Sequence, residues 1–227
     1  QAFRQTVEMG WPRMINILLT GVGGQGTVLA AKILALAAST KGWKARTAET
    51  IGMAQRGGSV ISHVRIGNLG EDVHAPLVTQ GSADLIIAFE PGEAARVLPY
   101  LSKTGTIVTA TTTVEPVSAA IGDVPYDAKQ ILESMQLSLY NAMVKSITRG
   151  KTRKQLQSRL VPVNDAAIIA KLGGNRKVLN SIMLAVAVSQ NVLPLSLDDL
   201  TAAVSACVKP QFVEMNIRAI EAALEGG

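Results

Sequence analysis

The chain has 227 residues, of which 48% are hydrophobic, 17% charged and 4% aromatic, and its mean hydropathy is +0.26. That length can bury the core of one α/β domain with a helical appendix. Charge is scarce for a globular surface, so we expect a partner to cover part of it. The longest apolar runs are broken by Lys, Ser or Gln well before the roughly 20 residues of a membrane-spanning helix. We therefore expect no membrane association.

The single cysteine and the first residues of the chain bear on its compartment. Cys207 alone cannot form an internal disulfide, and a zinc knuckle or an iron–sulfur cluster needs about four thiolate or imidazole ligands. Residues 1–13 carry no apolar segment of the secretory type, so we interpret them as an N-terminal extension and expect a cytoplasmic location. Any redox centre should then belong to another chain.

The net charge of +5 comes from one basic stretch. Residues 145–177 contain nine Lys or Arg and a single acid, Asp165, whereas the remainder has 13 basic and 16 acidic residues. Such a stretch can bind nucleic acid. It contains no aromatic residue and no recognised nucleic-acid motif. We therefore favour a solvated helix and loop surface and expect no nucleic-acid partner.

The predicted elements alternate between strands and helices over the first half of the chain. Residues 14–21 form an apolar run that ends in glycine, which is typical of a buried parallel strand. Residues 24–41 contain helix formers without a polar face, which predicts a buried helix. Residues 59–66 alternate apolar with polar side chains and predict a strand near a sheet edge. Further strands are expected at 43–49, 84–90, 106–111 and 160–163, and a helix at 93–98.

Beyond residue 125 the apolar period changes from two to about 3.6. Helical spacing relates Leu132, Met135, Leu139 and Met143. Three more helices are expected at 178–190, 196–208 and 211–224, with prolines between them. This order predicts an α/β fold with a Rossmann-like, mostly parallel sheet, helices on both of its faces and a C-terminal helical segment.

A glycine-rich loop joins the first strand to the first helix. Its sequence G-V-G-G-Q-G places Gly21, Gly23 and Gly26 in the spacing G-x-G-x-x-G. Glycine backbone can approach an anion closely, and the free N–H groups at a helix start favour negative charge. We therefore expect a phosphate or diphosphate near residues 23–27. Glu49, at the end of the second strand, could hold the ribose of a dinucleotide; the alternative is tight strand-to-helix packing without a ligand.

A second group of candidate residues follows the second strand. Within ten residues the chain contains Arg56, Gly57, Gly58, Ser59, Ser62, His63 and Arg65. Hydrogen-bond donors beside a flexible backbone suit a carboxylate or a phosphate better than an adenine pocket. For His63 an equally weighted alternative is a strand histidine that is hydrogen-bonded inside the sheet.

Five separated blocks of the sequence carry a family resemblance. They are GVGGQGTVLAAKILA, AETIGMAQRGGSVISHVRIG, ADLIIAFEPGEAARVL, GNRKVLNSIMLA and KPQFVEMNIRAIEAAL. In this order they resemble the gamma-type domain of 2-oxoacid:ferredoxin oxidoreductases. The block MAQRGGSVISHVRIG is most similar to the beta subunit of indolepyruvate:ferredoxin oxidoreductase. The resemblance covers residues 14–227, which we expect to form one domain. It weakens at about residues 127–159, where we expect a helical insertion.

The resemblance implies a subunit that works only within an assembly. Members of this family decarboxylate a 2-oxo acid on thiamine diphosphate, pass electrons through [4Fe–4S] clusters to ferredoxin, and release an acyl-CoA. The thiamine site and the clusters belong to a large partner subunit, so no catalytic residue and no metal are expected on this chain. Coenzyme A is the implied co-substrate, ferredoxin is reached through the complex, and a second copy of the chain is another candidate partner.

The resemblance also assigns roles to the candidate residues. Related pyruvate enzymes carry a G-x-x-x-x-G-T-V-x-A-x-K pattern that helps to bind coenzyme A, and Lys32 stands at the position of its lysine. The implied coenzyme A site consists of Gly21, Gly23, Gly24, Gln25, Gly26, Thr27 and Lys32. The implied cleft facing the thiamine subunit is lined by Arg56, Gly57, Gly58, Ser59, His63 and Arg65. An ammonium in an otherwise apolar helix is expected to be paired or to face a ligand.

Two other functions remain compatible with the residues. The spacing of Gly21, Gly23, Gly26 and Glu49 fits a stand-alone NAD(P)- or FAD-binding Rossmann oxidoreductase. A non-enzymatic partner that kept the fold and lost the activity is the third hypothesis.

Overall fold

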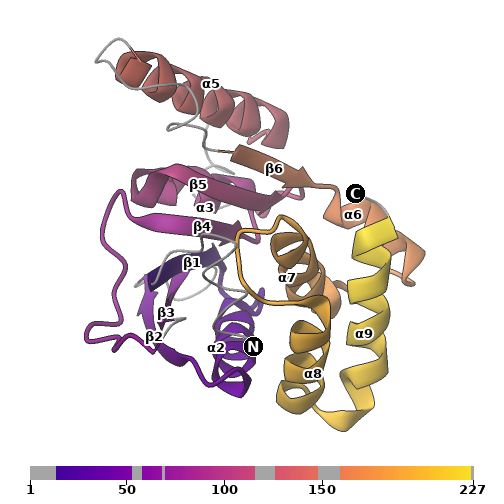
Figure 1. The fold of residues 1–227 in the computed structure, drawn as a ribbon. Helices are drawn as coiled ribbons and strands as arrows, with labels where there is room; N and C mark the ends of the chain where they lie inside the picture. The colour runs from indigo at the N-terminus through magenta and orange to yellow at the C-terminus, as the bar shows by residue number, and fades with distance from the viewer. Residues whose placement is uncertain (1–13, 53–57, 68–69, 116–125, 148–158, 226–227) are drawn as a thin grey trace.

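The computed structural model describes residues 14–52, 58–67, 70–115, 126–147 and 159–225. At its centre lies one six-stranded sheet in the order β2-β3-β1-β4-β5-β6. The strands are β1 (Met14–Val22), β2 (Lys44–Ile51), β3 (Ser59–Gly67), β4 (Ala83–Ala88), β5 (Leu101–Ala110) and β6 (Arg159–Val163). All six coincide with predicted strands to within a few residues, and Figure 1 shows them as one twisted layer.

The sheet is mixed but mostly parallel, as predicted. β1 with β4, β4 with β5, and β5 with β6 pair in parallel. β3 runs antiparallel to both of its neighbours, β1 and β2. The prediction that β3 lies near an edge is confirmed, since only β2 lies outside it. The alternating pattern of β3 did not reveal its direction, because an alternation sets the faces of a strand and not the sense in which it runs.

Helices cover both faces of the sheet. They are α2 (Thr27–Thr40), α3 (Pro91–Val97), α5 (Ala128–Ile147), α6 (Asp165–Lys171), α7 (Leu179–Ser189), α8 (Leu197–Cys207) and α9 (Pro210–Glu225), with 3-10 turns η1 (Leu98–Tyr100) and η3 (Arg176–Val178). Side chains of α2, α7, α8 and α9 share the larger apolar core with one face of β1 and β4. Side chains of α3 and α5 share a smaller core with the opposite face. Figure 1 accordingly shows α7, α8 and α9 grouped near α2, and α5 apart from them.

Two helix boundaries differ from the prediction for local reasons. α2 starts at Thr27 instead of residue 24, because Gly24 and Gly26 have φ angles of 93° and 85°, which a right-handed helix excludes. The short helix α6 was missed. It begins where the Asn164 side chain accepts a hydrogen bond from the N–H of Ala167 at 3.2 Å, and seven residues carry too little periodicity to be recognised.

Three C-terminal helices are confirmed where they were predicted. α8 starts with a capping box, in which Ser196 Oγ accepts from the N–H of Asp199 at 3.1 Å and Asp199 Oδ2 accepts from the N–H of Ser196 at 2.8 Å. α7 is buried on nearly all sides, because it lies between the sheet and the other helices of its layer. In the part of the chain that the structure describes, no helix is both long and apolar enough to cross a membrane.

Candidate functional site

The candidate site lies at the edge of the sheet where the parallel strands β1 and β4 end. The loop after β1 leads to α2 on one face, and the loop after β4 leads to α3 on the opposite face. Because neighbouring loops diverge there, this edge has the geometry in which open α/β sheets commonly bind ligands.

The glycine loop follows β1 directly and ends at α2. Gly26 lies in the left-handed region immediately before Thr27, the first helical residue. A Cβ at Gly21 would lie 2.7 Å from Gln25 Oε1 and 3.1 Å from Phe89 Cβ, so a side chain there would displace the loop. The start of α2 has no capping side chain and no acidic residue in its first turn. Its N–H groups are therefore available to an anion.

Gln25 fastens this loop to the end of β4. Its Oε1 accepts a hydrogen bond from the N–H of Val22 at 2.7 Å, and its Nε2 donates to the carbonyl of Phe89 at 3.0 Å. Both contacts are to main chain, so the amide of Gln25 acts on the shape of the loop. From the sequence, Gln25 was predicted to contact coenzyme A. Its contact with Phe89 was not predicted, because Phe89 is 64 residues away.

The beginning of β3 lies against the glycine loop. The N–H of Gly23 donates to the carbonyl of Gly58 at 3.0 Å. Ser59 Oγ donates to Glu93 Oε2 at 2.5 Å, which connects β3 to the first turn of α3. The two predicted groups of site residues therefore meet through Gly23, Gly58 and Ser59. Arg56 and Gly57 lie outside the described residues.

His63 and Arg65 lie further along β3, away from the loop. The Nδ1 atom of His63 accepts a hydrogen bond from the N–H of Val78 at 3.1 Å, and burial lowers the pKa of this imidazole. Arg65 donates to Asn16 Oδ1 and to the carbonyl of Ala75, both at 2.8 Å. The structure thus places both residues against the segment that precedes β4. It does not bring either of them together with the glycine loop.

A buried carboxylate and its half-buried tyrosine partner at the same edge were not foreseen from the sequence. Glu90 is 1% exposed and accepts hydrogen bonds from the N–H of Glu93 at 2.9 Å and from the hydroxyl of Tyr126 at 3.0 Å. Burial raises the pKa of Glu90, and these hydrogen bonds oppose the rise. Burial and then the charge of Glu90 raise the pKa of Tyr126. The available signal was Pro91, because proline is typical of the first position of a helix, which makes Glu90 the N-cap.

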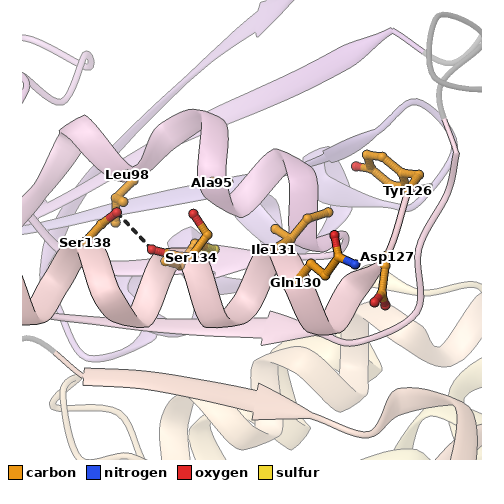
Figure 2. A pocket seen from close by; sticks show the side chains of 9 residues that line it. Ala95, Leu98, Tyr126, Asp127, Gln130, Ile131, Ser134 and Ser138 are labelled. Carbon is orange, nitrogen blue, oxygen red and sulfur yellow. Dashed lines mark hydrogen bonds between the residues drawn. The ribbon is translucent and has the colours of Figure 1, made fainter. Parts of the chain in front are cut away.

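Tyr126 also lines a pocket of about 440 Å³ between α3 and α5. Figure 2 shows Tyr126 and Asp127 at one end of this pocket and Ser134 and Ser138 further along α5. Ser138 Oγ donates to the carbonyl of Ser134 at 2.9 Å. The walls combine hydroxyl, amide and apolar groups from the two helices. The pocket meets the carboxyl edge of the sheet through the Tyr126 and Glu90 pair.

Lys32 is exposed on α2, one and a half turns beyond the glycine loop. It lies near Cys207: burial raises the pKa of the Cys207 thiol, and the ammonium of Lys32 partly opposes that rise. No group of three or more His, Cys, Asp or Glu residues that could hold a metal ion occurs within the described ranges.

The dinucleotide hypothesis fails on the strand order. In a Rossmann site the acid that holds the ribose ends the strand adjacent to β1. Here β3 separates β2 from β1, which puts Glu49 roughly 10 Å from β1, two strand spacings away. Glu49 is exposed on this edge strand, so its predicted role beside the glycine loop has no geometric support.

The sequence matches known proteins over most of its length. The family model of pyruvate ferredoxin/flavodoxin oxidoreductase matches residues 16–226. The indolepyruvate oxidoreductase subunit IorB of Archaeoglobus fulgidus is 35% identical over 208 residues, which cover 91% of this chain and 92% of that protein. IorB of Thermococcus kodakarensis is 35% identical over 206 residues, with the same shares covered.

Solved structures share the fold at lower identity. The gamma subunit of keto/oxoacid ferredoxin oxidoreductase from Geobacter sulfurreducens has a TM-score of 0.62 and 20% identity, covering 93% of this chain and 97% of that one. A 2-oxoglutarate:ferredoxin oxidoreductase from Magnetococcus marinus has a TM-score of 0.63 and 14% identity, covering 94% of this chain and 31% of that one.

The fold and its edge define a Rossmann-like glycine-loop domain in which an antiparallel strand lies beside β1 and a layer of helices closes the C-terminal half. The sequence matches then show to which family of such domains the chain belongs. The chain belongs to the pyruvate ferredoxin/flavodoxin oxidoreductase family, as the five sequence blocks predict.

Proposed function

We propose that this chain is a subunit of a 2-oxoacid:ferredoxin oxidoreductase of the indolepyruvate type. The observation that carries the proposal is the identity of 35% with an indolepyruvate oxidoreductase subunit over more than nine-tenths of both chains. Of the two other hypotheses, the dinucleotide enzyme is opposed by the position of Glu49. A partner without activity is opposed by the intact loop at the carboxyl edge of the sheet.

The subunit is proposed to act in a complex with a large subunit that carries thiamine diphosphate and [4Fe–4S] clusters. The thiamine cofactor supplies the decarboxylation chemistry when it is bound, and electrons leave through the clusters to ferredoxin. A chain with one cysteine cannot supply the thiolates of such a cluster. We place this complex in the cytoplasm.

Residues of this chain are proposed to hold the phosphates of coenzyme A, the co-substrate whose thiol receives the acyl group. The free N–H groups at Thr27 and the open loop at Gly23 and Gly24 can accept an anion, and Lys32 adds a full charge on the same helix. Gln25 keeps the loop in shape through its contacts with Val22 and Phe89.

Gly58 and Ser59 are proposed to face the thiamine subunit, a role that the family resemblance also gives to Arg56 and Gly57, which lie outside the described residues. Gly58 and Ser59 lie beside the glycine loop, so a ligand held by the loop would reach the partner across this surface. We assign His63 and Arg65 to holding residues 75–78 against the sheet instead, because their described contacts are made there.

The assignment is tested by producing the chain with and without the thiamine-binding subunit. Indolepyruvate- and CoA-dependent reduction of a viologen dye is expected from the pair and not from the chain alone. Activity of the isolated chain, or an inactive pair whose thiamine and clusters are in place, would contradict the proposal.

A variant of Lys32 tests the coenzyme A site within that complex. Lys32→Ala removes one charge-assisted contact, worth about 1.5–3 kcal/mol, and should raise the KM for coenzyme A roughly ten- to a hundredfold while the KM for the 2-oxo acid stays unchanged. Lys129→Ala is the matched control, since Lys129 is an exposed lysine on α5, across the sheet. An unchanged KM for coenzyme A in Lys32→Ala would remove Lys32 from the site.

A further inference from the structure

A buried carboxylate in the first turn of α3 connects that helix to the start of β3. Glu93 is 6% exposed. Its Oε2 accepts a hydrogen bond from Ser59 Oγ at 2.5 Å, and its Oε1 accepts from Arg96 Nε at 3.3 Å. Arg96 is largely exposed, so water screens this ion pair and it adds little. The strong contact of the carboxylate is therefore the charge-assisted hydrogen bond from Ser59.

The place of Glu93 within α3 does not account for its burial. A glutamate at the third position of a helix commonly accepts the N–H of the N-cap residue, which in α3 is Glu90. Among the described residues the Glu93 carboxylate accepts from Ser59 and Arg96 instead. An exposed acid would interact with the helix dipole equally well. Burying a carboxylate carries a desolvation cost, so a side chain that served only packing would be apolar here.

The start of β3, which Glu93 holds, is also the place where the glycine loop leaves the sheet. Ser59 is the first residue of β3 and lies opposite Val22, the last residue of β1. The ladder continues one step beyond this pair, because the N–H of Gly23 donates to the carbonyl of Gly58 at 3.0 Å. Gly23 therefore belongs both to the end of the ladder and to the glycine loop. The position of the start of β3 thus sets the position of the loop.

A second contact ties the loop to the same end of α3. The side chain of Gln25 donates to the carbonyl of Phe89, just before α3, at 3.0 Å. The first turn of α3 is itself held firmly, since the hydroxyl of Tyr126 lies so close to Gly92 that a side chain at this glycine would displace it. The loop is therefore held from two sides by one anchored turn, through Phe89 and through Glu93.

We propose that Glu93 is a positioning residue of the coenzyme A site, which holds the glycine loop in its binding shape through Ser59 and the hydrogen bond between Gly58 and Gly23. Glu93 is too buried to touch a ligand, so it acts on the loop alone. The inference rests on the proposed function, because it names a further residue that controls the same loop. The role requires an acceptor oxygen at position 93 and no charge, which separates it from the ion pair with Arg96.

The first test measures the loop and does not require activity. The exchange rate of the Gly23 N–H is followed by NMR in the isotopically labelled full chain and in its Glu93→Ala and Glu93→Gln variants. We expect exchange about tenfold faster in Glu93→Ala. The rate in Glu93→Gln should stay close to the wild type, because the amide oxygen still accepts from Ser59 and the exposed Arg96 can turn to water.

An amide in the core serves as the reference for this test. The N–H of Ile107 in the buried part of β5 should exchange at the same rate in all three proteins, because only global unfolding opens it. Equal Gly23 rates in all three proteins, or acceleration of Gly23 and Ile107 alike, would overturn the proposal.

The second test measures KM values in the complete complex. Glu93→Ala and Ser59→Ala should each raise the KM for coenzyme A about five- to tenfold and leave the KM for the 2-oxo acid unchanged, with Glu93→Gln close to the wild type. The double variant should be no worse than either single variant, since the two side chains act through one hydrogen bond. Glu133→Ala, which removes an exposed glutamate of α5, is the control.

Two results of the kinetic test would contradict the role of Glu93. They are additive effects in the double variant, and a loss in Glu93→Gln as large as that in Glu93→Ala. If the complex is inactive, the proposed function fails, and the exchange of the Gly23 N–H still decides whether Glu93 positions the loop.

Discussion

The two faces of the sheet are built very differently. On one face α2 and α7 lie on the strands, and α8 and α9 pack against them, so the core there is two layers of helices deep. On the other face α3 and α5 cover only part of the strands with a small core. The outer side of α5 carries exposed apolar side chains among polar ones, with Leu137 and Tyr140 60% and 56% exposed.

This difference shows where the fold can build a site. Where several helices converge beside the glycine loop, their ends leave a pocket with fixed walls and converging lysines. Where a single long helix lies over α3, the gap between the helices is a groove with polar and apolar walls. The two faces should therefore respond differently to substitution.

The largest effect is expected in the thicker core. Ile182→Ala removes a fully buried side chain of α7 and should lower the free energy of unfolding by about 2–5 kcal/mol. Met135→Ala on α5 removes a side chain that is equally buried but borders the groove, so α5 can shift and the loss should lie at the lower end. Denaturant titrations measure the two losses in free energy of unfolding. An equal or greater loss at Met135 would show that the two cores do not differ in this way.

The next effect concerns the loop beneath the thicker layer. Gly26→Ala forces a side chain into the left-handed conformation and should cost roughly 1–2 kcal/mol of stability. Gly23→Ala is the matched control, since its Cβ would lie 3.6 Å from the nearest atom beyond its chain neighbours, the carbonyl oxygen of Gly58. It should change the free energy of unfolding by less than about 0.5 kcal/mol. Thermal and denaturant unfolding of the two variants compare them directly.

A smaller effect should depend on pH and belongs to the thinner face. Because burial lowers the pKa of His63 below 6.5, the unfolded chain binds a proton that the folded chain resists. The stability that His63 contributes is present above pH 6.5 and is lost as the pH falls below it. Unfolding measured from pH 7.5 to 5 should show a shallower pH dependence in His63→Gln than in the wild type. The exposed neighbour His74 is the control, and a slope unchanged in His63→Gln would contradict the buried contact with Val78.

The smallest effect is expected on the exposed side of α5. Leu137→Gln should change the free energy of unfolding of the chain by less than about 0.5 kcal/mol, because Leu137 is largely exposed. The same substitution at the half-buried Leu139 on the same helix should cost more, and circular dichroism during denaturation compares the two. Equal costs would show that the outer side of α5 contributes to the packing of the chain.

Much of the site could be predicted because it lies within short stretches of sequence. The glycine spacing from Gly21 to Gly26 indicated both the loop and its place between strand and helix. The contact of Gln25 with Phe89 and the pair of Glu90 with Tyr126 could not be predicted, because each joins residues 36 or 64 positions apart. The pocket beside the glycine loop could not be predicted either, because its walls come from α2, α7 and the α8–α9 corner.

The sequence by itself determined the strands and most helices, the glycine loop and the family, since these depend on local periodicity and on residue types at fixed spacing. The tertiary structure alone decided that β3 runs antiparallel between β1 and β2, which separates Glu49 from the loop. It also decided that His63 and Arg65 contact the segment before β4, and that Lys177 and Lys209, far apart in sequence, line one pocket. The physical reason is that strand direction and side-chain partners are fixed by which surfaces the whole chain can bury together.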